Sequence, residues 1–189
     1  MKLTKYIVLG VIASLAAGFT SCSDDDEINL EDYQVWRQTN DDWVSRLRDS
    51  VDAEGNKYYE VVVPAWNPSA FVLMHFFNDR SETAQNLTPL YTSVVDVIYE
   101  GYTCLGEQFD SSKDTNKYGR TGIQRFGCNR TIQGWSIALE NMHVGDTCEL
   151  IVPYQVGYGS ATTSVLPPYT SLRFNMRLYD IYKYEGSSY

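Results

Sequence analysis

The sequence predicts an α+β fold in which antiparallel strands pack against one short helix. The clearest sign is a two-residue alternation near the C-terminus. The apolar residues are Leu172, Phe174, Met176 and Leu178, and the polar or aromatic residues that alternate with them are Arg173, Asn175, Arg177 and Tyr179. That period is typical of a strand with one buried face. Residues 94–99 and 148–152 predict further strands, and residues 136–142 predict a helix of about two turns lying on the sheet.

Upstream of these elements, the pattern predicts one longer helix and two strands. Residues 31–50 have helical spacing of large apolar side chains, which gather on one face: Tyr33, Trp36, Trp43 and Leu47. Residues 58–63 and 70–77 are β-branched and aromatic runs, and the polar residues 78–88 predict a loop. The chain therefore divides near residue 88 into an N-terminal extension, residues 31–88, and a C-terminal domain, residues 89–184. The extension could be a dimerisation arm, strands added to the sheet, or a partner site.

The first 21 residues have the anatomy of a secretory signal peptide. Lys2 and Lys5 precede an apolar or small-residue run from Tyr6 to Phe19, which is short for a bilayer span. The run ends in Thr20-Ser21-Cys22, which resembles a bacterial lipobox, in which the cysteine is acylated and becomes the new N-terminus. An ordinary signal peptide cut nearby, with an incidental cysteine, is the alternative. We expect lipidation at Cys22 to hold the protein on a membrane.

An acidic segment follows this cysteine and indicates where the protein is placed. Residues 24–27 are all acidic, so residues 22–30 predict a solvated tether. The pattern also resembles the export signal that places some Gram-negative lipoproteins on the outer face of the outer membrane. We therefore expect an exported protein anchored to the outer membrane, on the cell surface rather than facing the periplasm, with the second orientation left open.

Composition excludes several classes of function. The chain has a formal charge of −9, which becomes −11 once residues 1–21 and their two lysines are removed. Such acidity argues against binding of nucleic acid. A hydrophobic share of 43% in 189 residues is enough for one well-packed domain. The two histidines have no partner at metal-binding spacing, so no metal is expected. The sequence leaves the oligomeric state open.

Three cysteines remain downstream of Cys22. An exported chain meets oxidising conditions, so one disulfide is possible and one thiol is left over in a monomer. Cys148 lies in a predicted strand and is expected to be a buried thiol. Cys104 and Cys128 lie in turn-like contexts and are the pair expected if one disulfide forms, and whether they pair is left open.

Short motifs follow one another in an order that resembles the FKBP-type peptidyl-prolyl cis–trans isomerases, from residue 89 to about residue 182. They are Val97-Ile98-Tyr99-Glu100-Gly101, Phe109-Asp110-Ser111-Ser112, Phe126-Gly127, Ile132-Gln133-Gly134-Trp135, Met142-His143-Val144-Gly145, Gly157-Tyr158-Gly159, Leu166-Pro167-Pro168 and Ser171-Leu172-Arg173-Phe174. Each motif alone is weak, and their shared order makes the resemblance specific. It implies an FKBP-like curved antiparallel sheet wrapped around one short helix, with a pocket between them.

The resemblance also implies the residues of that pocket, taken one position at a time. Trp135 matches the floor, Asp110 a side-wall carboxylate, and Tyr158 a phenol that donates to a substrate carbonyl, so these three and Phe174 are the expected catalytic residues. The expected substrate-binding residues are the aromatic walls, a wall residue whose backbone amide binds ligand together with its neighbour, and the apolar flap: Tyr99 and Phe109, Ile132 and Thr131, and Val165 and Leu166. The resemblance implies proline-containing, unfolded or extended polypeptides as partners, and no cofactor.

Some positions depart from the family pattern. The arginine that often follows the aspartate by five residues is Thr115 here, so Arg120 or Arg125 could substitute, or nothing. The stretch between Asp110 and Gly127 is about three residues longer than usual, and a wall phenylalanine in it has no secure match, with Tyr118 and Ile123 as candidates. These departures leave two functions open. The protein is either a prolyl isomerase of exported or envelope proteins or a catalytically weak module that binds hydrophobic or proline-containing segments.

Overall fold

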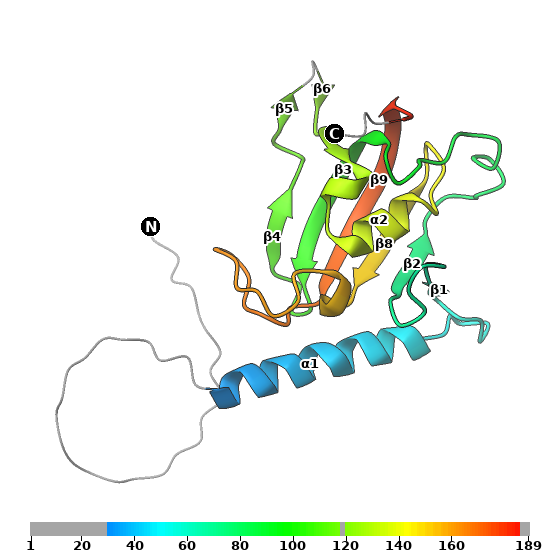
Figure 1. Cartoon of the computed structure of the whole chain (residues 1–189). Coiled ribbons are helices and arrows are strands. Elements are labelled where there is room, and N and C mark those ends of the chain that lie inside the picture. The colour runs from blue at the N-terminus through cyan, green and yellow to red at the C-terminus, as the bar shows by residue number, and fades with distance from the viewer. Residues whose placement is uncertain (1–29, 118–119, 186–189) are drawn as a thin grey trace, which may run out of the picture.

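The computed structural model describes residues 30–117 and 120–185, and these residues confirm the predicted α+β class (Figure 1). The predicted signal peptide and most of the predicted tether, including Cys22, lie outside them. None of the described helices combines the length and the apolar character that crossing a membrane would require. The elements in chain order are α1 (Leu30–Asp49), β1 (Glu60–Val62), β2 (Val72–Phe76), β3 (Val94–Thr103), β4 (Gln108–Ser111), β5 (Asn116–Lys117), β6 (Arg120–Thr121), β7 (Gln124–Gly127), α2 (Gln133–Leu139), β8 (Thr147–Val152) and β9 (Leu172–Lys183).

One antiparallel sheet organises the described chain, in the order β1-β2-β8-β9-β3-β4, with β7 also paired to β3. The predicted alternation in β9 is confirmed, because Leu172, Phe174, Met176 and Leu178 are all buried. Their side chains face α2, which lies in front of β8 and β9 in Figure 1, and they form the main core with it.

The short helix α2 is three residues further upstream than predicted. It begins at Gln133 because the carbonyl of Ile132 accepts the N–H of Trp135 at 2.9 Å and that of Ser136 at 3.3 Å. It ends at Leu139, and tighter turns carry the chain on to the buried Met142. The helix packs closely on the sheet: a Cβ on Gly134 would lie 2.4 Å from Cγ1 of Val152.

The predicted helix over residues 31–50 is confirmed as α1, and it covers the opposite face of the sheet. Val44 is buried there with Leu73 and Ile151, which point away from α2 because neighbouring strand residues alternate between faces. The predicted apolar face omits Asn40, which is fully buried and accepts a hydrogen bond from the N–H of Ser171 at 2.8 Å.

The extension joins the sheet through β2, which pairs with β8 in the register Met74–Leu150. Strand addition is thus the alternative, among those left open, that the structure supports. The loop that follows β2 is also attached to the C-terminal domain. Asn86 donates to the carbonyl of Val144 at 2.8 Å, and the N–H of Val144 donates to the carbonyl of Leu87 at 2.9 Å.

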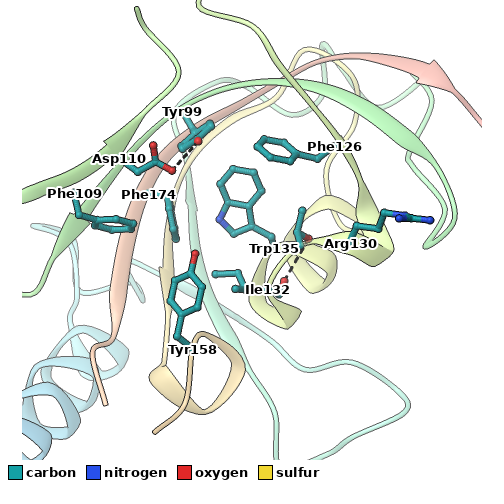
Figure 2. A pocket seen from close by; sticks show the side chains of 10 residues that line it. Tyr99, Phe109, Asp110, Phe126, Arg130, Ile132, Trp135, Tyr158 and Phe174 are labelled. Carbon is teal, nitrogen blue, oxygen red and sulfur yellow. Dashed lines mark hydrogen bonds between the residues drawn. The ribbon is translucent and has the colours of Figure 1, made fainter. Parts of the chain in front are cut away.

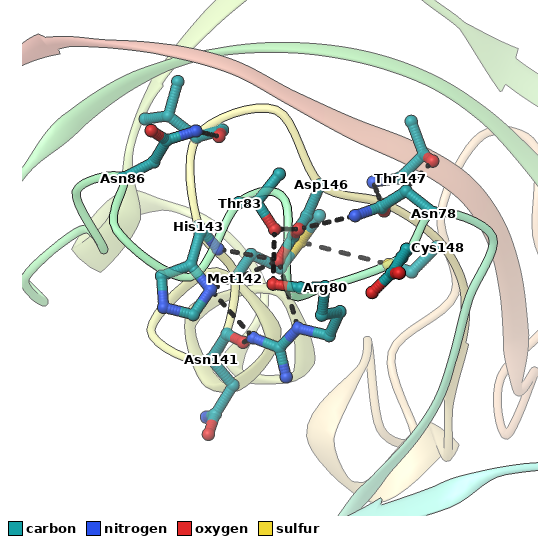
Figure 3. A network of polar contacts seen from close by, with 12 residues as sticks. Asn78, Arg80, Thr83, Asn86, Asn141, Met142, His143, Asp146, Thr147 and Cys148 are labelled. Carbon is teal, nitrogen blue, oxygen red and sulfur yellow. Dashed lines mark hydrogen bonds and ion pairs between the residues drawn. The ribbon is translucent and has the colours of Figure 1, made fainter.

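A buried carboxylate holds this loop in place (Figure 3). The side chain of Asp146 is fully buried, and it accepts hydrogen bonds from Thr83 Oγ1 at 2.5 Å, Asn78 Nδ2 at 3.0 Å and the N–H of His143 at 2.8 Å. Arg80 Nε lies 3.4 Å from the same carboxylate, and Arg80 Nη2 donates to the carbonyl of Asn141, just beyond α2, at 2.8 Å. Burial raises the pKa of Asp146, but the hydrogen bonds and the guanidinium outweigh it and lower the pKa overall.

The predicted disulfide between Cys104 and Cys128 is wrong, since all three cysteines among the described residues are free thiols. Cys128 lies beside the start of β3, where its N–H donates to the carbonyl of Ser93, whereas Cys104 follows the end of that ten-residue strand. A strand of that length spans about 33 Å, far beyond the reach of a disulfide. Cys148 is buried as predicted.

Candidate functional site

A cavity of about 350 Å³ opens between α2 and the sheet, and most of the predicted site residues line it (Figure 2). Eight of the ten predicted catalytic and substrate-binding residues lie together here, with two residues that were not predicted to belong to the site. The lining residues are Tyr99, Phe109, Asp110, Phe126, Arg130, Thr131, Ile132, Trp135, Tyr158 and Phe174.

Trp135 forms the floor, because α2 carries its indole ring onto the sheet. The side chain is only 4% exposed, and three rings stand nearly perpendicular to it: Tyr99 at 4.9 Å, Phe174 at 5.2 Å and Phe126 at 5.5 Å between ring centroids. Figure 2 shows the indole ring between the side chains of Phe126 and Phe174. Such edge-to-face packing fixes each ring, so the floor is rigid and apolar.

Gly101 in β3 makes room for the aromatic wall that Phe109 and Phe174 form. Phe109 and Phe174 pack edge to face with centroids 5.7 Å apart. A Cβ on Gly101 would lie 2.8 Å from an atom of each ring, closer than carbon atoms approach one another. Gly101 was part of a recognised motif, but this cross-strand contact depends on the register of β3 with β4 and β9 and is invisible in one sequence.

Asp110 is held by a tyrosine and not by an arginine. Tyr99 Oη donates to Asp110 Oδ2 at 2.8 Å, and the N–H of Ser111 donates to Oδ1 at 2.8 Å. Arg125 instead forms two contacts with Asp96, at 2.6 and 2.8 Å, and the guanidinium of Arg120 lies 5.1 Å from the ring of Tyr179. Neither arginine substitutes for the family arginine. Burial and then the hydrogen bond with Asp110 raise the pKa of Tyr99 above its ordinary value near 10.

Besides the buried indole Nε1 of Trp135, the Tyr158 hydroxyl and the N–H of Ile132 are hydrogen-bond donors of the lining residues that have no partner among the described residues. Tyr158 is 43% exposed, its hydroxyl group points into the cavity in Figure 2, and burial followed by the charge of Asp110 raises its pKa. The phenol therefore keeps its proton at neutral pH. The second donor is the N–H of Ile132, the extended residue that caps α2. Thr131 instead turns its hydroxyl to the carbonyl of Cys128 at 2.9 Å.

Two lining residues were missed and two predicted residues lie elsewhere. Phe126 stands where a wall phenylalanine was sought, whereas the candidate Ile123 is buried outside the cavity and Tyr118 lies outside the described residues. The extra residues before β7 form the β5–β6 hairpin, which shifts the spacing. Val165 and Leu166 do not line this cavity, and their substrate contacts stay predictions.

The chemistry available in the cavity is non-covalent. Its surface is mostly aromatic. Its polar groups are the Tyr158 hydroxyl, the N–H of Ile132, the indole N–H of Trp135, one carboxylate already bonded by Tyr99, and the side chains of Arg130 and Thr131. Neither histidine and none of the three described cysteines lines it. The described residues contain no cluster of three potential metal ligands. Such a site can hold a compact apolar ring and orient the carbonyl groups beside it.

Comparisons with known proteins agree with this geometry. Residues 87–179 match the family model described as FKBP-type peptidyl-prolyl cis-trans isomerase. The chain is 34% identical over 115 residues to the macrophage infectivity potentiator of Trypanosoma cruzi, covering 60% of this chain and 54% of that protein. It is 30% identical over 100 residues to the FKBP-type isomerase FkpA of Escherichia coli K12, covering 53% of this chain and 35% of the relative. The chain thus spans about half or less of these relatives.

Solved structures show the same fold. An isomerase from Pseudomonas syringae superposes with a TM-score of 0.61 at 20% identity, covering 78% of this chain and 94% of that one. Crystalline FkpA from Escherichia coli gives a TM-score of 0.60 at 19% identity, covering 81% of this chain and 66% of that one. The predicted FKBP-like fold is confirmed.

Proposed function

Because residues 87–179 belong to the FKBP-type peptidyl-prolyl cis–trans isomerase family, we propose that this protein accelerates rotation about X-Pro bonds in proline-containing polypeptides. The observation that carries the proposal is the cavity itself, in which an aromatic floor and walls surround unpaired hydrogen-bond donors, among them the Tyr158 hydroxyl and the N–H of Ile132. It has the size and the apolar surface to take a proline ring.

The reaction needs no acid, base or nucleophile. Resonance gives the X-Pro C–N bond double-bond character and a barrier of about 18–20 kcal/mol. That resonance is lost in the twisted transition state, and the amide becomes less polar. An apolar cavity therefore stabilises the twisted amide relative to the planar one, and each ~1.4 kcal/mol of that preference gives about a tenfold gain in rate.

Each residue that lines the cavity has its own role in binding the twisted amide. Trp135 supports the proline ring, and Phe109 and Phe174 exclude water from the bond that turns. Tyr158 donates a hydrogen bond to the carbonyl group of the residue before the proline, and the N–H of Ile132 is placed to bind a second carbonyl. Asp110 acts through Tyr99. Its carboxylate accepts a hydrogen bond from Tyr99 Oη at 2.8 Å and so holds the Tyr99 ring against the floor. Asp110 is thus proposed as a positioning residue.

Replacement of Tyr158 by phenylalanine tests the proposal. It removes one hydrogen bond and keeps the ring, so kcat/KM for an X-Pro peptide should fall about three- to tenfold. Exchange NMR on a short X-Pro peptide measures this rate. Tyr91→Phe is the matched control, because Tyr91 is an exposed tyrosine that does not line the cavity. A wild-type protein that binds the peptide but does not accelerate its rotation would instead be a binding module.

The cellular location is a further part of the proposal. The apolar run before Cys22 and the acids after it support export, lipid attachment at that cysteine and display on the outer membrane. Full-length protein from a bacterial host that lipidates exported proteins should carry acyl chains, detected by mass spectrometry, and Cys22→Ala should carry none. Identical masses, after allowance for the substitution, would contradict the lipid anchor.

A further inference from the structure

A second hollow lies between the start of α1 and the flap, which we define as residues 157–168. This helix–flap groove has a volume of about 410 Å³ and is formed by residues 162–168 of the flap together with Asp32 and Tyr33 of α1. It is separate from the central cavity, and the residues from α1 lie outside the region that matches the family model.

The groove holds the two predicted substrate-binding residues that the central cavity lacks. Leu166 forms part of its floor and is 3% exposed, whereas Val165 stands out from the flap and is 63% exposed. A tight turn presents them in this way, because the N–H of Thr163 donates to the carbonyl of Leu166 at 3.0 Å and the N–H of Leu166 donates back to Thr163 Oγ1 at 2.9 Å. The groove is therefore a formed apolar surface on an ordered turn.

Helix α1 is attached firmly to the base of the flap, which keeps the other wall in place. Trp36 Nε1 donates to Thr170 Oγ1 at 3.1 Å, and Arg37 Nε donates to the hydroxyl of Tyr154 at 2.9 Å. The guanidinium of Arg37 also lies 5.3 Å from the centre of the Tyr169 ring. These contacts begin one turn after Tyr33, so the groove exists before any ligand arrives.

The flap links the groove to the rim of the central cavity. The N–H of Tyr169 donates to the carbonyl of Gly159 at 2.8 Å, which joins the two stems of the flap next to Tyr158. The path from Tyr158 through Gly159 and Tyr169 to Leu166, three residues from Tyr169, therefore spans at most about 20 Å. An extended peptide held at Tyr158 reaches the groove within about six residues.

We propose that the helix–flap groove binds an apolar side chain of the same polypeptide whose proline occupies the central cavity, on the N-terminal side of that proline. The inference rests on the proposed function. The direction follows from Tyr158, which lies on the flap side of the cavity and reaches the carbonyl of the residue before the proline. The residues that precede it leave the cavity over the flap. Asp32 adds a carboxylate at the groove, which disfavours an acidic side chain there.

Four fourteen-residue peptides with a central Ala-Pro bond test the inference in exchange NMR. One carries leucine at the fourth, fifth and sixth positions before the proline, and two others carry glycine or glutamate at those positions. The fourth carries leucine at the fourth, fifth and sixth positions after the proline. The first peptide should have a kcat/KM about five- to tenfold above that of the glycine peptide, the gain expected from partial burial of one leucine. The glutamate peptide and the peptide with the displaced leucines should show no gain.

Variants of α1 assign the effect to the groove. Tyr33→Ala should bring the ratio of the leucine to the glycine peptide close to one, whereas Val35→Ala, an exposed position on the same helix outside the groove, should keep the wild-type ratio. A ratio near one in active wild-type protein, or a ratio that Tyr33→Ala leaves unchanged, overturns the groove and leaves the isomerase proposal standing. Wild-type protein that accelerates none of the four peptides overturns both.

Discussion

Replacement of Trp135 by alanine is expected to lower kcat/KM for X-Pro peptides by about ten- to a hundredfold. The indole ring is the floor of the cavity, and an aromatic contact of this kind contributes about 1–3 kcal/mol to the binding of a partner ring. Because every ~1.4 kcal/mol is a factor of ten in rate, the loss is larger than that expected from the single hydrogen bond of Tyr158. Exchange NMR at low peptide concentration measures it.

Two further variants make this result interpretable. Trp135→Ala also removes a buried side chain from the core and should cost about 3–5 kcal/mol of stability, so folded protein must be confirmed by circular dichroism. Trp135→Phe keeps an apolar ring in the cavity and should retain more activity than the alanine variant. Trp66→Ala removes a tryptophan that is 56% exposed and should keep full activity. Equal activity of the wild-type and the two Trp135 variants would rule out the indole as the catalytic floor.

Replacement of Asp146 by alanine is expected to lower the free energy of unfolding by about 3–5 kcal/mol, the largest stability effect we predict. The carboxylate is fully buried, accepts hydrogen bonds from Asn78, Thr83 and the N–H of His143, and forms an ion pair with Arg80. Its removal leaves buried donors and a guanidinium without their partner, which is more costly than the loss of an exposed ion pair. Urea denaturation of both proteins measures the difference.

Exposure and pH provide the controls for that prediction. Asp49→Ala removes the carboxylate of the exposed pair with Lys57, 3.4 Å apart, and should change stability by less than about 1 kcal/mol. The pKa of Asp146 is lowered on folding, so its stabilising effect is present above the ordinary carboxyl pKa of 3.8 and disappears as the pH falls through the lower folded value. The stability difference between wild type and Asp146→Ala should therefore be constant near neutral pH and shrink below about pH 4. A difference that grows on acidification would contradict this role.

The sequence predicted the sheet and most of the cavity because those features leave local signals. Alternation in residues 172–178 depends only on which face of one strand is buried, and Trp135 and Tyr158 lie in short motifs whose order survives variation elsewhere. Phe126 escaped prediction because the β5–β6 hairpin changes the spacing on which the assignment relied.

Features that depend on distant segments were not predictable from one sequence. Asn40 lies on the buried face of α1 only because the N–H of Ser171, 131 residues later, donates to it. The pairing of Cys104 with Cys128 failed because the length of β3 separates two turns that look alike in sequence. Val165 and Leu166 were predicted to line the central cavity, whereas they line the hollow that the flap forms with the distant helix α1.

The central claim is that the cavity accelerates X-Pro rotation by binding the twisted amide, with no proton transferred. The measurement that tests it most directly is kcat/KM of the wild-type protein for one short X-Pro peptide, followed by exchange NMR from pH 6 to pH 9. The raised pKa values of Tyr99 and Tyr158 keep both phenols protonated throughout, and no histidine lines the cavity. We predict a rate well above that of the peptide in buffer and constant across the range. A rate equal to that in buffer, or one that rises and falls with the titration of a single group, would contradict the claim.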